Sequence, residues 1–148
     1  MSDNQPAAVL DPDTARNLLE RAKEARAHAY APYSRFPVGA ALLARDGRVF
    51  TGVNVENASY GLANCAERTA IFKAVSEGVR DFTAIAVIGP QDQEECSPCG
   101  ACRQVLVEFG EDLIVVVPDG ANVKQQTMRD LLPGAFVPSR LGTREMPV

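Results

Sequence analysis

Two cysteine-bearing segments constrain this chain more than any other feature: Cys-Ala-Glu-Arg at residues 65–68 and Pro-Cys-Gly-Ala-Cys-Arg-Gln at residues 98–104. In the second segment, Ser97 is a favourable N-cap and Pro98 a favourable first helical residue, which predicts a helix over residues 98–109. Cys99 and Cys102 are then i and i+3 neighbours, so both sulfur atoms leave one face of the first turn. Two such thiolates can share one metal ion.

The first segment predicts a second helix start. Apolar residues recur at helical spacing after Cys65, and Gly78 provides a glycine exit. All three cysteines would therefore lie at helix N-termini, which carry partial positive charge. With Arg68 and Arg103 beside them, these ends lower the cost of holding three negative sulfur atoms on one divalent cation.

A carboxylate stands next to the predicted ligands. Three sulfur ligands leave one position of a tetrahedral zinc ion open, which distinguishes a catalytic from a structural site. A water molecule there becomes acidic enough to supply hydroxide near neutral pH. Glu67 lies two residues after Cys65, so its carboxylate points away from the ligand direction and can exchange protons with that water. We predict that Glu67 is a general acid and base.

Cys96 allows two alternative kinds of metal site. With the three predicted ligands it could complete a closed Cys₄ zinc site. However, Cys96 precedes the predicted N-cap, and a closed site would leave Glu67 no water to act on. An iron–sulfur cluster fits three of the four spacings but fails at Leu106, where the fourth cysteine would stand. We therefore favour the open three-cysteine site.

Composition narrows the class of protein. A chain of 148 residues that is 46% hydrophobic can form one domain with a proper core, which we expect over residues 1–148. The net charge of -4 and the lack of a basic run argue against long nucleic acids as partners. Neither a signal peptide nor a membrane-spanning run is found, so we expect a cytoplasmic protein without membrane contact. In that compartment, four cysteines indicate metal binding or catalysis before disulfides.

The N-terminal half predicts a tail, a helix and a hairpin. Residues 1–10 lack periodicity and indicate a flexible tail, and Asp13 or Thr14 would cap a helix that follows. His28 near its end has no second ligand at helical spacing, so we assign it a surface or packing role. The strands are expected at residues 36–44 and 48–55, joined by a two-residue Asp46-Gly47 turn.

The C-terminal half predicts a crossover unit. Apolar runs at residues 82–89 and 113–117 predict strands that are buried on both faces. One precedes and the other follows the helix over residues 98–109. Such a connection gives parallel strands. Thr127 to Asp130 resembles a capping box for a short last helix stopped by Pro133. The sheet is therefore mixed, with helices on both faces and a site at the carboxyl ends of its strands.

The ligand-x-Glu element followed by Pro-Cys-x-x-Cys is the signature of zinc deaminases. Within that group the chain resembles the small homotetrameric cytidine deaminases, from about Tyr30 to Phe136. The resemblance implies a three-layer α/β/α fold, with a mixed five-stranded sheet that has an antiparallel hairpin and parallel later strands. It also implies one Zn²⁺ per subunit, and hydrolytic deamination of cytidine and deoxycytidine to uridine and deoxyuridine in pyrimidine salvage. Sites would be completed by neighbouring subunits of a homotetramer.

The resemblance also implies how a nucleoside is bound. Phe36 would lie against the pyrimidine, although without the resemblance its residue type favours a place in the core. Asn54 and Glu56 share one face of a strand end, which suits sugar hydroxyls, and the family uses them on the ribose 3′ hydroxyl. The backbone of Ala66 would hold the base edge. Two further aromatic residues, Tyr60 and Phe136, would reach into a neighbour's site. Tyr60 fits a surface aromatic residue equally well, and the alternative for Phe136 is that it packs the C-terminal tail onto the domain.

Other functions stay open at this point. A deaminase of blasticidin S or of a pyrimidine nucleotide would share the zinc elements, although Glu56 would repel a phosphate group. A non-catalytic, zinc-stabilised module would bind the metal with all four positions filled. An RNA-editing role fits the catalytic elements, but the acidic net charge argues against it.

Overall fold

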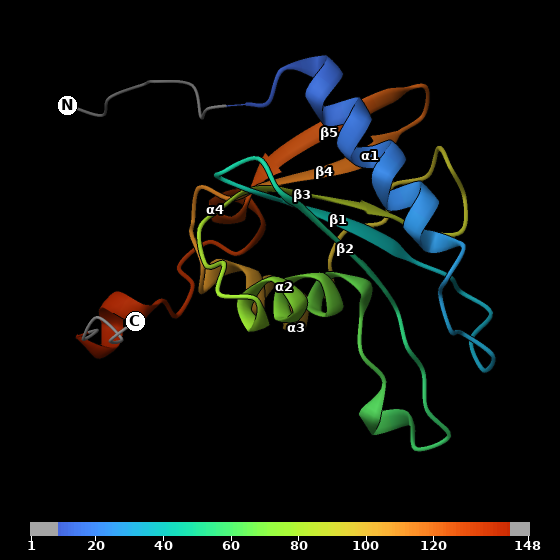
Figure 1. Cartoon of the computed structure of the whole chain (residues 1–148). Helices are drawn as coiled ribbons and strands as arrows, with labels where there is room; N and C mark the ends of the chain where they lie inside the picture. Colours follow the sequence, from blue (N-terminus) through green and yellow to red (C-terminus); the bar gives the residue numbers. More distant parts are fainter. Residues whose placement is uncertain (1–8, 143–148) are drawn as a thin grey trace.

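Residues 9–142 of this computed structural model are described, and they form three layers (Figure 1). Helix α1 covers one face of a five-stranded sheet, and α2 and α3 cover the other. The elements in chain order are α1 (Pro12–Arg26), β1 (Gly39–Ala44), β2 (Val49–Val53), η1 (Tyr60–Leu62), α2 (Ala66–Ser76), β3 (Phe82–Ile88), α3 (Gly100–Val107), β4 (Ile114–Asp119), β5 (Asn122–Thr127), α4 (Met128–Leu131) and η2 (Pro138–Leu141).

The sheet is mixed, as predicted, with the strand order β2-β1-β3-β4-β5. Strand β1 runs antiparallel to both β2 and β3, and the crossover through α3 makes β3 and β4 parallel. Strand β5 then returns antiparallel to β4 through a tight turn at Gly120, whose φ is 62°. The sequence did not place β5, because its polar, mostly half-buried residues lack the apolar run of the inner strands.

Two hydrophobic cores lie on the two faces of the sheet. The core under α1 is built largely from alanine, including Ala15 and Ala22, so this helix lies close to the strands. The larger core joins α2, α3 and α4 to the other face and contains Leu42, Ile71 and Leu106. Strands β1, β3 and β4 are buried on both faces, which confirms the interpretation of their apolar runs. Within residues 9–142, no helix is both long and apolar enough to cross a membrane.

Two glycines allow helices to approach the β1–β2 hairpin. A Cβ atom on Gly39 would lie 2.0 Å from the carbonyl oxygen of Ala22 in α1. On the other face, a Cβ atom on Gly52 would lie 2.4 Å from the carbonyl oxygen of Ala66 and 2.5 Å from the nitrogen of Ala70. The first turn of α2, which follows Cys65, therefore rests directly on β2.

The N-terminus of α1 differs from the prediction. Asp11 caps the helix, accepting hydrogen bonds from the nitrogens of Asp13 at 3.2 Å and Thr14 at 3.4 Å, because Pro12 can occupy the first helical position. Residues 1–8 of the predicted tail lie outside the described residues. Leu10 is held by Gln125, which donates to its carbonyl at 3.1 Å and accepts from its nitrogen at 2.8 Å.

Two other boundaries also differ. The β1–β2 loop has three residues instead of two, because Gly47 donates to the carbonyl of Ala44 and takes a φ of 96° while Arg48 pairs with Ala44. Helix α3 begins at Gly100 with Cys99 as its N-cap, two residues later than predicted. The capping box at Thr127 and Asp130 is confirmed in both directions, at 3.2 and 3.1 Å.

Candidate active site

The three predicted metal ligands come together at two adjacent helix starts. Cys65 is the N-cap of α2, Cys99 is the N-cap of α3, and Cys102 lies in the first turn of α3. Their sulfur atoms all lie within 4.8 Å of one another. A tetrahedral zinc ion with Zn–S bonds of ~2.3 Å requires sulfur atoms ~3.8 Å apart, so a separation within 4.8 Å is compatible with one ion bound by all three.

Arg68 supplies positive charge to this cysteine cluster. Its Nη2 donates to the Sγ of Cys65 at 3.1 Å, and that bond raises the pKa of the guanidinium. Its Nε is buried and has no partner among the described residues. A guanidinium pointed at sulfur atoms favours their thiolate form, which is the form that binds metal. The donor set therefore fits a zinc ion.

Arg103 has other contacts than the prediction gave it. Its guanidinium donates to the carbonyl oxygens of Pro98 and Leu131, both at 2.8 Å, and to the hydroxyl of Ser97 at 3.1 Å. None of these bonds reaches a cysteine. Arg103 instead holds the loop that leads into α3, and this loop positions Cys99.

Cys96 lies apart from the cysteine cluster. A Cβ atom on Gly89 would lie 3.1 Å from the Sγ of Cys96 and 3.7 Å from the ring of Phe36, so these three residues are neighbours. Burial raises the pKa of the Cys96 thiol to about 11. Within residues 9–142, the group of metal-binding side chains contains three cysteines and neither Cys96 nor His28. This arrangement is the open site and not the closed Cys₄ alternative.

Glu67 is buried directly after the first ligand. Only 5% of it is exposed, and burial raises the pKa of its carboxyl. A hydrogen bond with Cys102 and the charge of Arg68 act in the opposite direction. A carboxyl that binds its proton more tightly than usual, next to a metal site, can both take up and release a proton near neutral pH.

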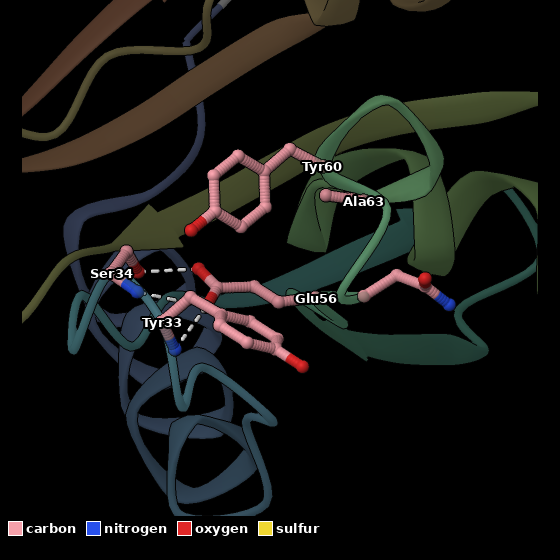
Figure 2. A pocket seen from close by; sticks show the side chains of 6 residues that line it. Tyr33, Ser34, Glu56, Tyr60 and Ala63 are labelled. Atoms are coloured by element: carbon pink, nitrogen blue, oxygen red, sulfur yellow. Dashed lines mark hydrogen bonds between the residues drawn. The ribbon is translucent and has the colours of Figure 1, made fainter.

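A pocket with a cavity volume of about 300 Å³ holds Glu56 (Figure 2). It is lined by Tyr33, Ser34, Glu56, Asn57, Tyr60 and Ala63. One carboxylate oxygen of Glu56 accepts hydrogen bonds from the nitrogens of Tyr33 and Ser34, both at 3.0 Å, and the other accepts from the Ser34 hydroxyl. The bonds from Ser34 hold the pKa of Glu56 below its usual range, so the carboxylate stays ionised.

Asn54 holds the segment that carries Phe36. Its amide nitrogen donates to the carbonyl of Phe36 at 2.8 Å, and its amide oxygen accepts from the nitrogen of Val38 at 2.9 Å. The Phe36 side chain is 49% exposed, so it is not a core residue. Asn54 and Glu56 thus face the same loop, residues 30–38, as their i, i+2 spacing predicted.

The remaining predicted residues lie in two places. Tyr60 on η1 is 75% exposed, and its ring meets that of Tyr33 edge-on at 5.7 Å. Phe136 is 59% exposed on the C-terminal segment, where its carbonyl accepts from Gln104 at 2.9 Å. Figure 1 shows the red C-terminal segment with η2 apart from the green loop with η1. Ala66 is fully buried as the first residue of α2.

Sequence reasoning missed two residues that hold this site in place. Ser34 bonds Glu56, and Gln104 bonds the backbone of Phe136. A signal for Ser34 was present, because serine two residues before Phe36 is typical of a turn in which the hydroxyl accepts a backbone N–H. Nothing in the sequence pairs Gln104 with a segment 32 residues away.

Comparison with known proteins agrees with this geometry. A family model described as "Cytidine and deoxycytidylate deaminase zinc-binding region" matches residues 12–117. The chain belongs to the cytidine deaminase family. A relative named "Cytidine deaminase" from Sporosarcina psychrophila is 52% identical over 121 residues, covering 80% of this chain and 88% of the relative.

Solved structures of the family share the fold. A crystal structure of cytidine deaminase from Burkholderia pseudomallei is 55% identical with a TM-score of 0.77, covering 82% of this chain and 98% of that one. A crystal structure of cytidine deaminase from Mycobacterium leprae is 45% identical with a TM-score of 0.73, covering 84% and 99%. The three-layer α/β/α architecture implied by the sequence is therefore confirmed.

Proposed function

We propose that this chain hydrolyses cytidine and deoxycytidine to uridine and deoxyuridine, with release of ammonia. The observation that carries the proposal is the buried Glu67 beside three cysteines that converge on one point. Relatives from Sporosarcina psychrophila and Halalkalibacterium halodurans, 52% and 53% identical, are both named cytidine deaminase.

Cys65, Cys99 and Cys102 would hold a zinc ion, one in each subunit. Zinc, when bound, supplies the Lewis acidity that makes water a nucleophile at neutral pH. Arg68 stabilises the thiolate form of the cysteines through its bond to Cys65. Arg103 keeps the loop before Cys99 in the shape that brings the two helix starts together.

Glu67 would move the protons of the reaction. Its carboxylate would take one proton from the attacking water and give it to ring N3. It would then take the second proton from the new C4 hydroxyl and give it to the amine, which leaves as ammonia. Burial raises the pKa of the Glu67 carboxyl and so favours the protonated form that holds the proton between the two transfers. Hydrolysis needs no further acid or base.

The loop residues would bind the nucleoside. The exposed ring of Phe36 can stack on the pyrimidine. The backbone N–H of Ala66, at the start of α2 where such groups have no partner within the helix, can hold the base edge. Asn54 and Glu56 would bind the ribose 3′ hydroxyl, and the ionised Glu56 would disfavour a nearby phosphate. These contacts favour nucleosides over nucleotides.

We also propose a homotetramer in which Tyr60 and Phe136 complete neighbouring sites. Both side chains are large, aromatic and mostly exposed in the single chain, as are Leu62 at 70% and Phe72 at 51%. Exposed apolar side chains of this size are typical of contact surfaces between proteins. A cytoplasmic setting in pyrimidine salvage remains a prediction from the sequence.

Ultraviolet absorbance of cytidine, deoxycytidine, cytosine and CMP, each incubated with zinc-loaded protein, tests the substrate class. We expect loss of absorbance for the two nucleosides and none for CMP or cytosine. Turnover of CMP in preference to cytidine would replace the nucleoside proposal with a nucleotide one. Absence of turnover of all four would leave the proposal without support.

The Glu67→Gln variant tests the role of the carboxyl. We expect it to keep its zinc content and to lose turnover by about 10²–10⁴-fold, because the amide cannot carry the proton. Glu77→Gln, at the exposed other end of α2, is the matched control and should keep full activity. Normal activity of Glu67→Gln would contradict this mechanism.

A further inference from the structure

We propose that Ser34 is a positioning residue that joins sugar recognition by Glu56 to base stacking by Phe36. The inference rests on the proposed function and adds a residue to which neither the sequence nor the family signature gave a role. Ser34 touches neither the metal site nor the reacting atoms, so its effect would be on binding.

The hydroxyl of Ser34 is bonded to both residues that it connects, and Figure 2 shows its bond to Glu56. It donates to one carboxylate oxygen of Glu56 and accepts from the nitrogen of Phe36 at 3.0 Å. The backbone nitrogen of Ser34 also donates to the other oxygen of Glu56, at 3.0 Å. One residue thus fixes the orientation of the carboxylate and the backbone of the aromatic residue.

Phe36 depends on these bonds for its position. Because its ring is about half exposed, packing alone does not hold it. Its N–H is held by Ser34 and its carbonyl by Asn54, so both polar groups of its backbone are bound by side chains at the sugar subsite. Stacking geometry on a base would therefore follow from how the sugar-binding pair is arranged.

The loop stores strain at the residue between Ser34 and Phe36. Arg35 has a φ of 55° and is the only non-glycine residue in the described chain with a positive φ. A long side chain rarely adopts this conformation, and it persists only where surrounding bonds enforce it. Loss of the Ser34 hydroxyl would remove one of these bonds and let the loop relax.

The carboxylate of Glu56 has limited capacity left. Its two oxygens offer about four acceptor positions, and the donors from Tyr33 and Ser34 use three of them. A sugar hydroxyl would take the remaining one in a fixed direction. The other titratable side chains that line this pocket are the phenols of Tyr33 and Tyr60.

The test compares Ser34→Ala, Ser34→Thr and the control Ser76→Ala, which removes an exposed hydroxyl bond of 2.7 Å at the far end of α2. Each variant is assayed for kcat and KM with cytidine. Inhibition by uridine is measured from acid to neutral pH, because uridine itself does not titrate there. The Glu56→Gln variant identifies which part of the pH dependence belongs to Glu56.

We expect Ser34→Ala to raise KM and the uridine inhibition constant about tenfold at neutral pH, with kcat unchanged, since it loses one charge-assisted hydrogen bond. Its weakening of uridine binding on acidification should begin at higher pH than in the wild type, because Glu56 loses a donor that holds its pKa down. Ser34→Thr keeps the hydroxyl and should behave like wild type, as should Ser76→Ala.

Two results would overturn the proposal: wild-type binding and pH dependence in Ser34→Ala, or equal losses in Ser34→Ala and Ser34→Thr. A lower kcat with unchanged KM would also contradict a positioning role. If the wild-type protein did not deaminate cytidine at all, the proposed function would fail instead, so the two failures are distinguishable.

Discussion

The cysteine cluster and the Phe36 loop, residues 30–38, are built in opposite ways. The cluster stands on the first turns of two helices that are packed against the sheet, and Glu67 beside it is almost fully buried. The loop is mostly exposed and is held by side-chain hydrogen bonds from Asn54, Glu56 and Ser34. Regular elements fix the groups that we propose carry out the chemistry, whereas polar side chains fix the groups that we propose recognise the substrate.

This difference has an energetic consequence. The packing of α2 and α3 on the sheet links the geometry of the cluster to the stability of the whole fold, because moving α2 would open the core. The loop can shift without exposing core residues. We therefore expect changes at the cluster to abolish turnover or stability, and changes at the loop to weaken binding alone.

The largest effect is expected at a metal ligand. Cys102→Ser should lose zinc and activity together, because a serine hydroxyl is a poor zinc ligand and Cys102 is fully buried. Zinc content per chain and cytidine turnover are measured before and after chelation and zinc addition. The wild-type protein should regain both zinc and cytidine turnover when zinc is added back, and the Cys102→Ser variant should regain neither. Cys96→Ser is the matched control, and loss of zinc from it would revive the closed Cys₄ site.

The contact of α2 with β2 should be almost as sensitive. Gly52→Ala places a methyl group 2.4 Å from a backbone oxygen and should lower the free energy of unfolding by about 3 kcal/mol. Gly61→Ala, on η1 with open space around it, should have little effect on stability. Denaturant unfolding measures both. Equal stability of the two variants would mean that the helix is not tightly packed at this point.

A variant of Phe136 tests whether substrate binding depends on a side chain from a neighbouring subunit. Phe136→Ala should raise KM about tenfold with little change in stability, because its ring is mostly exposed. Chains of Phe136→Ala and Glu67→Gln are then unfolded, mixed and refolded together. If Phe136 completes a neighbour's site, some mixed sites regain both residues and show a wild-type KM. Activity equal to the sum of the separate variants would place Phe136 outside the neighbour's site.

The smallest effect is expected at Phe36. Phe36→Leu keeps an apolar side chain but loses the flat ring, which should raise KM by about fivefold and leave kcat and the melting temperature unchanged. Phe72→Leu, with the same chemistry and a similar exposure of 51%, is the matched control. A fall in melting temperature with Phe36→Leu alone would indicate that the ring is part of the packing. The Phe36 loop would then contribute to stability as the cysteine cluster does.

Much of the cluster was predictable because its geometry is local. The i, i+3 spacing of Cys99 and Cys102 places two ligands on one turn whatever the rest of the chain does. The apolar runs of β1, β3 and β4 predicted doubly buried strands and the parallel crossover. Helix starts shifted by one or two residues, because Asp11 and Cys99 act as caps in place of the predicted residues.

The Phe36 loop was much less predictable. Asn54 and Glu56 were identified as a pair, but their partners are backbone groups 16 to 23 residues away. Ser34 contacts Glu56 only because β2 ends beside the loop that precedes β1. Likewise, β5 was not predicted, because an edge strand needs no apolar pattern.

The sequence by itself predicted the ligand set, the proposed acid–base carboxylate and the α-helices and β-strands from α1 to β4, because each depends on residue type and short spacing. Only the tertiary structure decided that Cys65 meets the other two cysteines, that Cys96 and Arg103 stand apart from them, and that Ser34 connects Glu56 to Phe36. These contacts join residues far apart in the chain, and the packing of α2 and α3 on one sheet brings them together.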